Sequence, residues 1–178
     1  MKNNGCTFIA SSLHDLSFGY DFESPECSYL ISQLNENITE VYKSGVRDFY
    51  SVCEEGFDLW AAKDVIGLIK SDNSVRLHCI LPFEEQAAKW HPSLRELYYT
   101  VLEQAESAEF VSLRYREDCM KKARYRTLDQ SGYVISVCGS EEMREYKNYA
   151  LWKGIKLVDI RSEYSDAFER TVRSEKVS

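Results

Sequence analysis

The sequence predicts an α/β protein with a single Rossmann-like, doubly wound and mostly parallel sheet that is flanked by helices on both faces. Three observations support this fold class. The 178 residues are 44% hydrophobic and include twelve Tyr, eight Phe and three Trp, which is enough apolar material for one buried core. Short runs rich in β-branched and aromatic residues alternate with segments whose apolar residues recur at helical spacing. The connections are short, which is typical of crossover units between parallel strands.

The first half of the chain contains two strand patterns and two helix patterns. Residues 6–11 (CTFIAS) form a β-branched and aromatic run. Residues 25–43 place apolar side chains at every third or fourth position, and Ser24 precedes them as an N-cap. Residues 48–53 (DFYSVC) resemble a strand, and residues 56–70 (GFDLWAAKDVIGLIK) form a strongly apolar helix pattern. This order predicts the first βαβα unit of the sheet.

The second half continues the same alternation. Residues 75–83 (VRLHCILPF) predict a strand, and residues 93–107 predict a helix with apolar residues on one side. A short strand at 109–113 and a basic helix at 118–130 follow. The last three elements are a buried strand, a helix and a strand, at 133–139, 141–153 and 156–160.

We expect one domain over residues 1–161, followed by a polar C-terminal tail or short helix over residues 162–178. The net charge of -7 argues against a general nucleic-acid-binding or membrane-surface protein. No apolar run approaches the ~18 residues that a membrane span needs. The N-terminal sequence lacks the pattern of a signal peptide, so the expected location is cytoplasmic.

The six cysteines show no CxxC or CxxH spacing, and no two of the three histidines have metal-ligand spacing. The sequence therefore predicts no metal and no cofactor. Several cysteines lie in apolar runs, which favours buried free thiols in a reducing compartment.

Ligands of open parallel sheets bind beyond the carboxyl ends of the strands, where the N-termini of helices offer free N–H groups. Topology alone therefore selects the turns that follow the predicted strands. These turns comprise residues 10–14, 51–58, 82–86, 114–119 and 138–143.

The second of these turns carries a family resemblance. Residues 48–62 (DFYSVCEEGFDLWAA) resemble the FxSGxAxGxDxxAA segment of the YpsA-like branch of the SLOG superfamily. Residues 80–83 (ILPF), with Gln86 and Trp90, are similar to its PFxxQxxxW segment. Further pieces follow in register, so that the resemblance extends over residues 6–160. It implies a Rossmann-like fold that binds nucleotides or nucleotide derivatives.

Carried over residue by residue, the resemblance and the topology predict a set of ligand-binding residues. The Arg-Asn pair of the family aligns with Ala123-Arg124, where this chain departs from the pattern but keeps a basic residue. Asp58 matches the family position after Gly56, although an Asp is also typical of the first turn of a helix. The predicted ligand-binding residues are Ser11, Ser51, Glu54, Glu55, Gly56, Asp58, Pro82, Trp90, Arg124, Gly139, Ser140 and Glu141.

The sequence departs from the family where small residues would cradle a phosphate. Glu54 and Glu55 occupy one such turn, and Glu141 and Glu142 occupy another. Backbone N–H groups contact an oxyanion only where no side chain intervenes, and carboxylates would repel it. These residues could instead complement the N-termini of helices, bind a cation or a cationic partner, or act as acid and base.

The expected function is a non-catalytic SLOG-like ligand-binding or regulatory domain, for a nucleotide-related small molecule or with that binding lost. One alternative is a protein–protein interaction module on a Rossmann-like scaffold, and a homodimer stays open. Another is a hydrolase of a nucleotide derivative that uses Glu141, Glu142 or Asp58. The sequence contains no GxSxG elbow, and Cys53 beside acidic residues should have a raised thiol pKa, so catalysis is less favoured.

One basic segment stands out in this acidic chain. Residues 114–126 (RYREDCMKKARYR) contain six basic residues with Tyr115 and Tyr125 between them. Basic residues beside aromatic ones can bind nucleic acid, but a solvated helix face with salt bridges to neighbouring acids is the commoner arrangement.

Overall fold

The computed structural model describes residues 3–137 and 141–161. In this part of the chain six parallel strands form one sheet in the order β4-β3-β2-β1-β5-β6. The strands are β1 (Gly5–Ala10), β2 (Asp48–Ser51), β3 (Arg76–Phe83), β4 (Ser107–Ser112), β5 (Ser131–Val137) and β6 (Lys156–Ile160). The predicted α/β class is confirmed, and the sheet is wholly rather than mostly parallel.

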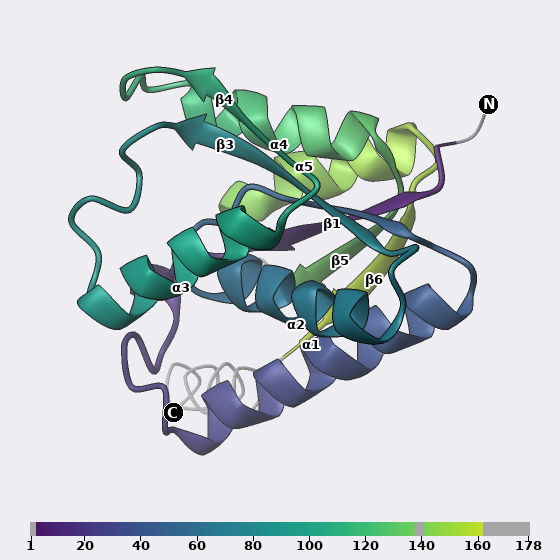
Figure 1. The fold of residues 1–178 in the computed structure, drawn as a ribbon, viewed down its shortest axis with the longest axis horizontal. Helices are drawn as coiled ribbons and strands as arrows, with labels where there is room; N and C mark the ends of the chain where they lie inside the picture. Colours follow the sequence, from purple (N-terminus) through teal and green to yellow (C-terminus); the bar gives the residue numbers. More distant parts are fainter. Residues whose placement is uncertain (1–2, 138–140, 162–178) are drawn as a thin grey trace, which may run out of the picture.

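Helices cover both faces of the sheet (Figure 1). The helices are α1 (Pro25–Lys43), α2 (Phe57–Ser71), α3 (Pro92–Gln104), α4 (Cys119–Asp129) and α5 (Glu141–Trp152), and a 3-10 turn spans Leu13–Asp15. α1, α2 and α3 lie on one face, while α4 and α5 lie on the other. This arrangement is the doubly wound one that the alternating pattern predicted.

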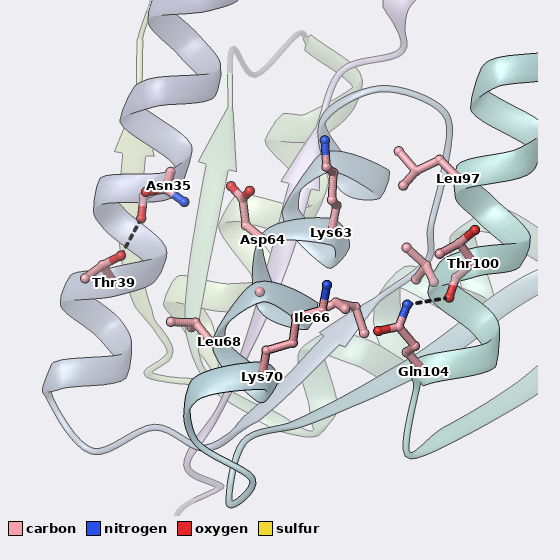
Figure 2. Close-up of a pocket in the computed structure, with 12 residues that line it drawn as sticks. Asn35, Thr39, Lys63, Asp64, Ile66, Leu68, Lys70, Leu97, Thr100 and Gln104 are labelled. Atoms are coloured by element: carbon pink, nitrogen blue, oxygen red, sulfur yellow. Dashed lines mark hydrogen bonds between the residues drawn. The ribbon is translucent and has the colours of Figure 1, made fainter.

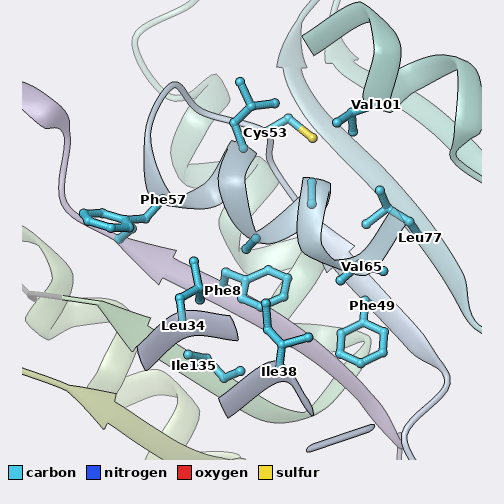
Figure 3. Packing of buried hydrophobic residues seen from close by; sticks show 14 of the residues in the cluster. Phe8, Leu34, Ile38, Phe49, Cys53, Phe57, Val65, Leu77, Val101 and Ile135 are labelled. Carbon is cyan, nitrogen blue, oxygen red and sulfur yellow. The ribbon is translucent and has the colours of Figure 1, made fainter. Parts of the chain in front are cut away.

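The larger core lies between the sheet and the first three helices. Phe8 and Phe49 of the sheet stack with ring centroids 6.5 Å apart, and Leu34 and Ile38 of α1 lie against the same side (Figure 3). α1 starts where the sequence predicted, because the Oγ of Ser24 accepts a hydrogen bond from the Cys27 N–H at 3.1 Å. Apolar residues four apart on this helix therefore face the sheet.

The predicted boundary between α3 and β4 is wrong by a few residues. The helix ends at Gln104 rather than at residue 107, and the strand begins at Ser107 rather than at residue 109. The backbone N–H of Glu106 already donates to the carbonyl of Leu77 in β3 at 2.8 Å. Pairing with the neighbouring strand thus overrides the helical pattern of the residues after Gln104.

A polar network joins the amino ends of β2, β3 and β4. Arg76 donates two hydrogen bonds to the carboxylate of Asp48, at 2.8 and 2.7 Å. The two ring nitrogens of His78 lie 2.8 Å from the Oδ1 of Asp48 and 2.8 Å from the Oγ of Ser107. The hydrogen bond from Arg76 is the main cause that lowers the pKa of Asp48 to about 2. These cross-strand bonds help to fix the register of the three strands.

Two expectations about the environment of the chain can be compared with this structure. Cys6, Cys27, Cys53, Cys79 and Cys119 are buried free thiols, as predicted, and Cys138 lies outside the described residues. Within residues 3–137 and 141–161, no helix has both the length and the apolar character that a membrane crossing requires. The C-terminal segment 162–178 also lies outside the described residues.

Candidate functional site

The order of the strands places the candidate site at the carboxyl ends of β1, β2 and β5. The chain proceeds from β1 outward to β4 on one side and then returns to place β5 on the other side of β1. The connections after β1 and β5 therefore leave toward opposite faces, and sheets of this kind bind their ligands at such a switch point. The turn after β2, which carries the family resemblance, lies beside it.

A buried charged network crosses this end of the sheet. Arg124 of α4 is 1% exposed, and its NH1 donates to the Oδ1 of Asp58 at 3.3 Å and to the carbonyl of Phe8 at 3.4 Å. Its NH2 donates to the Oδ2 of Asp58 at 3.0 Å, the Oε2 of Glu54 at 2.8 Å and the carbonyl of Ala10 at 3.3 Å. One guanidinium thus joins α4 to the end of β1 and to the first turn of α2.

The network holds two carboxylates against one guanidinium. The side chain of Asp58 is 2% exposed, while that of Glu54 is 27% exposed and is the member that reaches solvent. Burial raises the pKa of Glu54 to about 7, although the charge of Arg124 acts in the opposite direction. Burial also raises the pKa of Asp58. Glu54 therefore changes its protonation state near neutral pH.

Hydrogen bonds to backbone groups hold the turn that carries Glu54 in place. The Oγ of Ser51 accepts from the N–H of Cys53 at 3.0 Å and donates to the carbonyl of Asp58 at 3.1 Å. Gln86 donates to the carbonyl of Val52 at 3.1 Å. Cys53 has a φ of 52°, and its pKa is raised by a hydrogen bond to Cys79 and by burial, which agrees with the predicted direction. The buried side chain of Ser51 thus stabilises the turn through hydrogen bonds to two of its backbone groups.

Gly56 is the N-cap of α2 and allows the turn after β2 to pack closely against Leu13 in the connection after β1. Its φ is 108°, and a Cβ at this position would lie 2.9 Å from the side chain of Leu13. We expect Gly56→Ala to lower the free energy of unfolding by about 1–3 kcal/mol, because the backbone would be strained and Leu13 would have to move. Urea denaturation of the purified variant measures this change.

Gly67 provides a matched control on the same helix. It lies inside α2, and a Cβ there meets nothing within 4 Å. Gly67→Ala should leave stability unchanged or raise it by up to about 1 kcal/mol. Equal effects of the two substitutions would contradict the special role of the Gly56 backbone.

The remaining predicted carboxylates have different surroundings. Glu55 accepts a hydrogen bond from the hydroxyl of Tyr20, and burial together with this bond raises the pKa of Tyr20 to about 12. Glu141 pairs with Arg144 at 2.7 Å on the surface of α5. The charge of Glu142 contributes to the raised pKa of Glu54, so these two carboxylates from separate turns act on one another. The described residues include no group of three or more His, Cys, Asp or Glu side chains that could hold a metal ion.

The structure therefore brings together some of the predicted residues and separates others. Ser51, Glu54, Gly56, Asp58 and Arg124 form one connected unit. Sequence reasoning did not select Tyr20, since it lies in an irregular connection without a motif.

The other predicted residues lie around this unit or outside the described residues. Ser11 is buried directly after β1, and Pro82 is buried near the end of β3. Trp90 packs edge-on against Tyr98 with ring centroids 5.3 Å apart, so it lies partly buried against the core beside α3. Gly139 and Ser140 lie outside the described residues.

A cavity of about 560 Å³ lies elsewhere, between α1, α2 and α3 (Figure 2). Lys63, Asp64 and Lys70 of α2 line it together with polar side chains of α1 and α3, and none of the predicted site residues contributes. One carboxylate oxygen of Asp64 is buried without a hydrogen-bond partner among the described residues. The cavity and the charged network are therefore separate features, and the buried ion pairs belong to the network.

The basic segment forms salt bridges on the surface of α4. Lys121 pairs with Glu145 at 2.8 Å, and Lys122 pairs with Asp118 at 2.8 Å. These bonds match the expected solvated helix face, whereas Arg124 of the same segment is buried and departs from that expectation. Contact of this segment with nucleic acid stays a prediction.

Comparison with known proteins agrees with the resemblance in the sequence. The family model described as the YspA SLOG family matches residues 12–164. The UPF0398 protein BH1768 of Halalkalibacterium halodurans is 29% identical over 87 residues, which are 49% of this chain and 46% of the relative. A UPF0398 protein of Bacillus pumilus is 27% identical over 92 residues, 52% of this chain and 50% of the relative.

A third relative extends the match. The UPF0398 protein Lm4b_01906 of Listeria monocytogenes serotype 4b is 26% identical over 113 residues, 64% of this chain and 59% of the relative. The matched part of the chain spans about half of the first two relatives and somewhat more of the third. Because the family model covers most of the sequence, the chain belongs to the YspA SLOG family.

Proposed function

We propose that the chain is a non-catalytic ligand-binding domain for a nucleotide-related small molecule, with its site at the carboxyl ends of β1, β2 and β5. The observation that carries this proposal is the Arg124–Asp58–Glu54 network, which withdraws Arg124 and Asp58 from water and holds the partly exposed Glu54 at the edge where such sheets bind ligands. A buried ion pair adds little net stability compared with an apolar substitute. Perturbed ionisable groups of this kind gather at functional sites.

The charges at this edge favour a particular part of a nucleotide. Glu54 is the partly exposed member of the network, and the charge of Glu142 reaches it. A carboxylate accepts hydrogen bonds from hydroxyl and amino groups, whereas it repels a phosphate. The site therefore suits the ribose hydroxyls or the amino group of a base better than a polyphosphate chain.

A binding experiment tests this assignment. Adenosine, AMP, ADP and ADP-ribose are titrated into the purified protein by calorimetry, and the same compounds are used in a thermal-shift assay. We expect at least one compound to raise the melting temperature, because a ligand at 100 times its dissociation constant adds ~2.7 kcal/mol to stability. Adenosine or AMP should bind more tightly than ADP if the carboxylates repel phosphate.

The contribution of Glu54 is tested by Glu54→Gln. This variant should bind the active compound at least about tenfold more weakly, since a hydrogen bond to a charged group contributes about 1.5–3 kcal/mol. Glu85→Gln is the control, because Glu85 is an exposed residue in the turn after β3. The proposal fails if no compound binds, or if both variants bind as well as the original protein.

One observation favours hydrolysis as a second candidate function. A carboxyl group with a pKa of about 7, such as Glu54, can donate or accept a proton near neutral pH. Each compound is therefore also incubated with the protein and its products are separated by chromatography. Conversion that is lost in Glu54→Gln supports a hydrolase, while binding without conversion supports the ligand-binding domain.

A further inference from the structure

The sheet ends at β4, which is an open edge. Within residues 3–137 and 141–161, β4 pairs with β3 on one side and with no strand on the other. The backbone groups on its outer side are thus available to another strand. Proteins usually protect such an edge with Lys, Pro or a bulge, but the sequence SAEFVS of β4 contains neither Lys nor Pro, and Glu109 is its one charged residue.

The opposite edge of the sheet differs in this respect. β6 carries Lys156 and Asp159 within its five residues. Asp159 pairs with Lys147 at 3.0 Å and with Arg161 at 3.1 Å. Charges of this kind discourage edge-to-edge pairing. The two edges therefore differ in their capacity to accept another strand.

Several exposed apolar side chains come from β4 and from the segments next to it in the sequence. Seven large apolar side chains are exposed in the described part of the chain, and four of them come from residues 99–115. They are Tyr99 (51% exposed), Phe110 (39%), Leu113 (74%) and Tyr115 (70%). Phe110 lies in β4 itself, and Leu113 and Tyr115 closely follow it in the sequence. Exposed apolar side chains in and after an open edge strand are typical of an interaction surface.

Two of these side chains lie on the same face of the sheet. Phe110 pairs in register with Leu81, whose side chain is buried in the core beneath the first three helices. Leu97 and Thr100 of α3 line the cavity toward α2. The helical period therefore places Tyr99 on the side of α3 that faces away from α2. Phe110 and Tyr99 thus both belong to the side of the sheet that α3 covers.

We propose that a second copy of this chain occupies the edge, with the two β4 strands antiparallel and Phe110 opposite Phe110 of the second copy. The two copies are related by a twofold axis perpendicular to the sheet, which keeps the same face of both sheets on one side. The two side chains of each cross-strand pair therefore point to the same face. Glu109 then lies opposite Val111 of the second copy, and Ser107 lies opposite Leu113.

This register is consistent with the charges and with the aromatic residues. An axis through Glu109 would place two carboxylates directly opposite one another, which destabilises a strand pair. An axis through Phe110 instead places two aromatic rings together, and such pairs stabilise neighbouring strands. The two sheets would join into one continuous sheet across the dimer.

Light scattering coupled to size-exclusion chromatography tests the dimer with the full chain. We expect a mass of twice 20.7 kDa at micromolar concentration. Phe110→Lys should raise the dissociation constant of the dimer at least about tenfold, because it adds an edge charge and removes the aromatic pair. Leu151→Lys is the control, since Leu151 is 59% exposed on α5, away from β4. The proposal is overturned by a monomer at all concentrations, or by a dimer that Phe110→Lys leaves intact.

Cross-linking tests the register and does not depend on how well Phe110→Lys folds. Two thiols of Phe110→Cys should form a disulfide between copies when oxidised glutathione accepts the two electrons and is released as two glutathione thiols. Leu113→Cys is the control, because Leu113 faces Ser107 of the second copy in this register. Cross-linking of Leu113→Cys but not of Phe110→Cys would overturn the proposed pairing.

Discussion

Arg124→Met is expected to lower the free energy of unfolding at pH 7 by about 3–5 kcal/mol, because it removes one partner of a buried ion pair. Asp58 would remain 2% exposed without its countercharge. The carbonyls of Phe8 and Ala10 would each lose a donor. Met keeps much of the volume of the Arg side chain, so the change in the free energy of unfolding comes mainly from the loss of charge and not from a cavity. Urea denaturation followed by circular dichroism measures the change.

Arg126→Met is the matched control for this result. Arg126 lies on the same helix but is exposed, so its substitution should change stability by no more than about 0.5 kcal/mol. A loss of less than about 1 kcal/mol in Arg124→Met would show that the buried network contributes little. Arg124→Met should also recover part of its stability at low pH, where Asp58 takes up a proton and needs no countercharge.

The position of Arg124 shows which part of the site could be predicted from the sequence. The resemblance selected Arg124 as a ligand contact, and the structure places it inside the protein with five internal acceptor contacts. Helical spacing contained a signal for this burial, because Ala123, Thr127 and Leu128 share its buried side of α4. A basic residue on an otherwise buried face indicates an internal ion pair, but its carboxylate partners lie 66 and 70 residues away in the sequence.

The fold was more accessible to sequence reasoning than the site. Local periodicity determines α1 and the burial of strands, and the predicted bounds of α1 and β6 match the structure. Elements that depend on neighbouring strands were less predictable, as the early start of β4 shows. The contact between Tyr20 and Glu55 depends wholly on tertiary structure. Local patterns specify elements, whereas a site built from separate turns depends on how those elements pack.

Glu54→Gln is expected to stabilise the protein at pH 8 by up to about 3 kcal/mol and to change its stability little below pH 4.5. Burial raises the pKa of Glu54 from 4.5 to about 7. The native state therefore holds a proton that the unfolded chain releases, so the contribution of Glu54 to stability is full below pH 4.5. This contribution is lost as the pH rises through about 7. The total loss is about 1.4 kcal/mol for each unit by which folding raises the pKa of Glu54.

Urea denaturation at pH 4.5, 6 and 8 measures this effect, with Glu85→Gln as the control. The difference between Glu54→Gln and the original protein should grow with pH, whereas Glu85→Gln should follow the original protein throughout. A Glu54→Gln variant that is destabilised at pH 8 would show that the carboxylate is held by Arg124 as a stabilising partner. The pKa of Glu54 would then be lowered by folding rather than raised.

A stabilising Glu54→Gln would also bear on the proposed function. A carboxylate that lowers stability at neutral pH does not stabilise the fold there, although Arg124 holds it by a hydrogen bond at the carboxyl ends of the strands. Residues of this kind are typical of sites in which activity requires a group that the fold alone would not favour. If Glu54→Gln gains stability and loses the nucleoside ligand, the two results together assign Glu54 to binding. If it gains stability and binds equally well, the ligand does not contact Glu54.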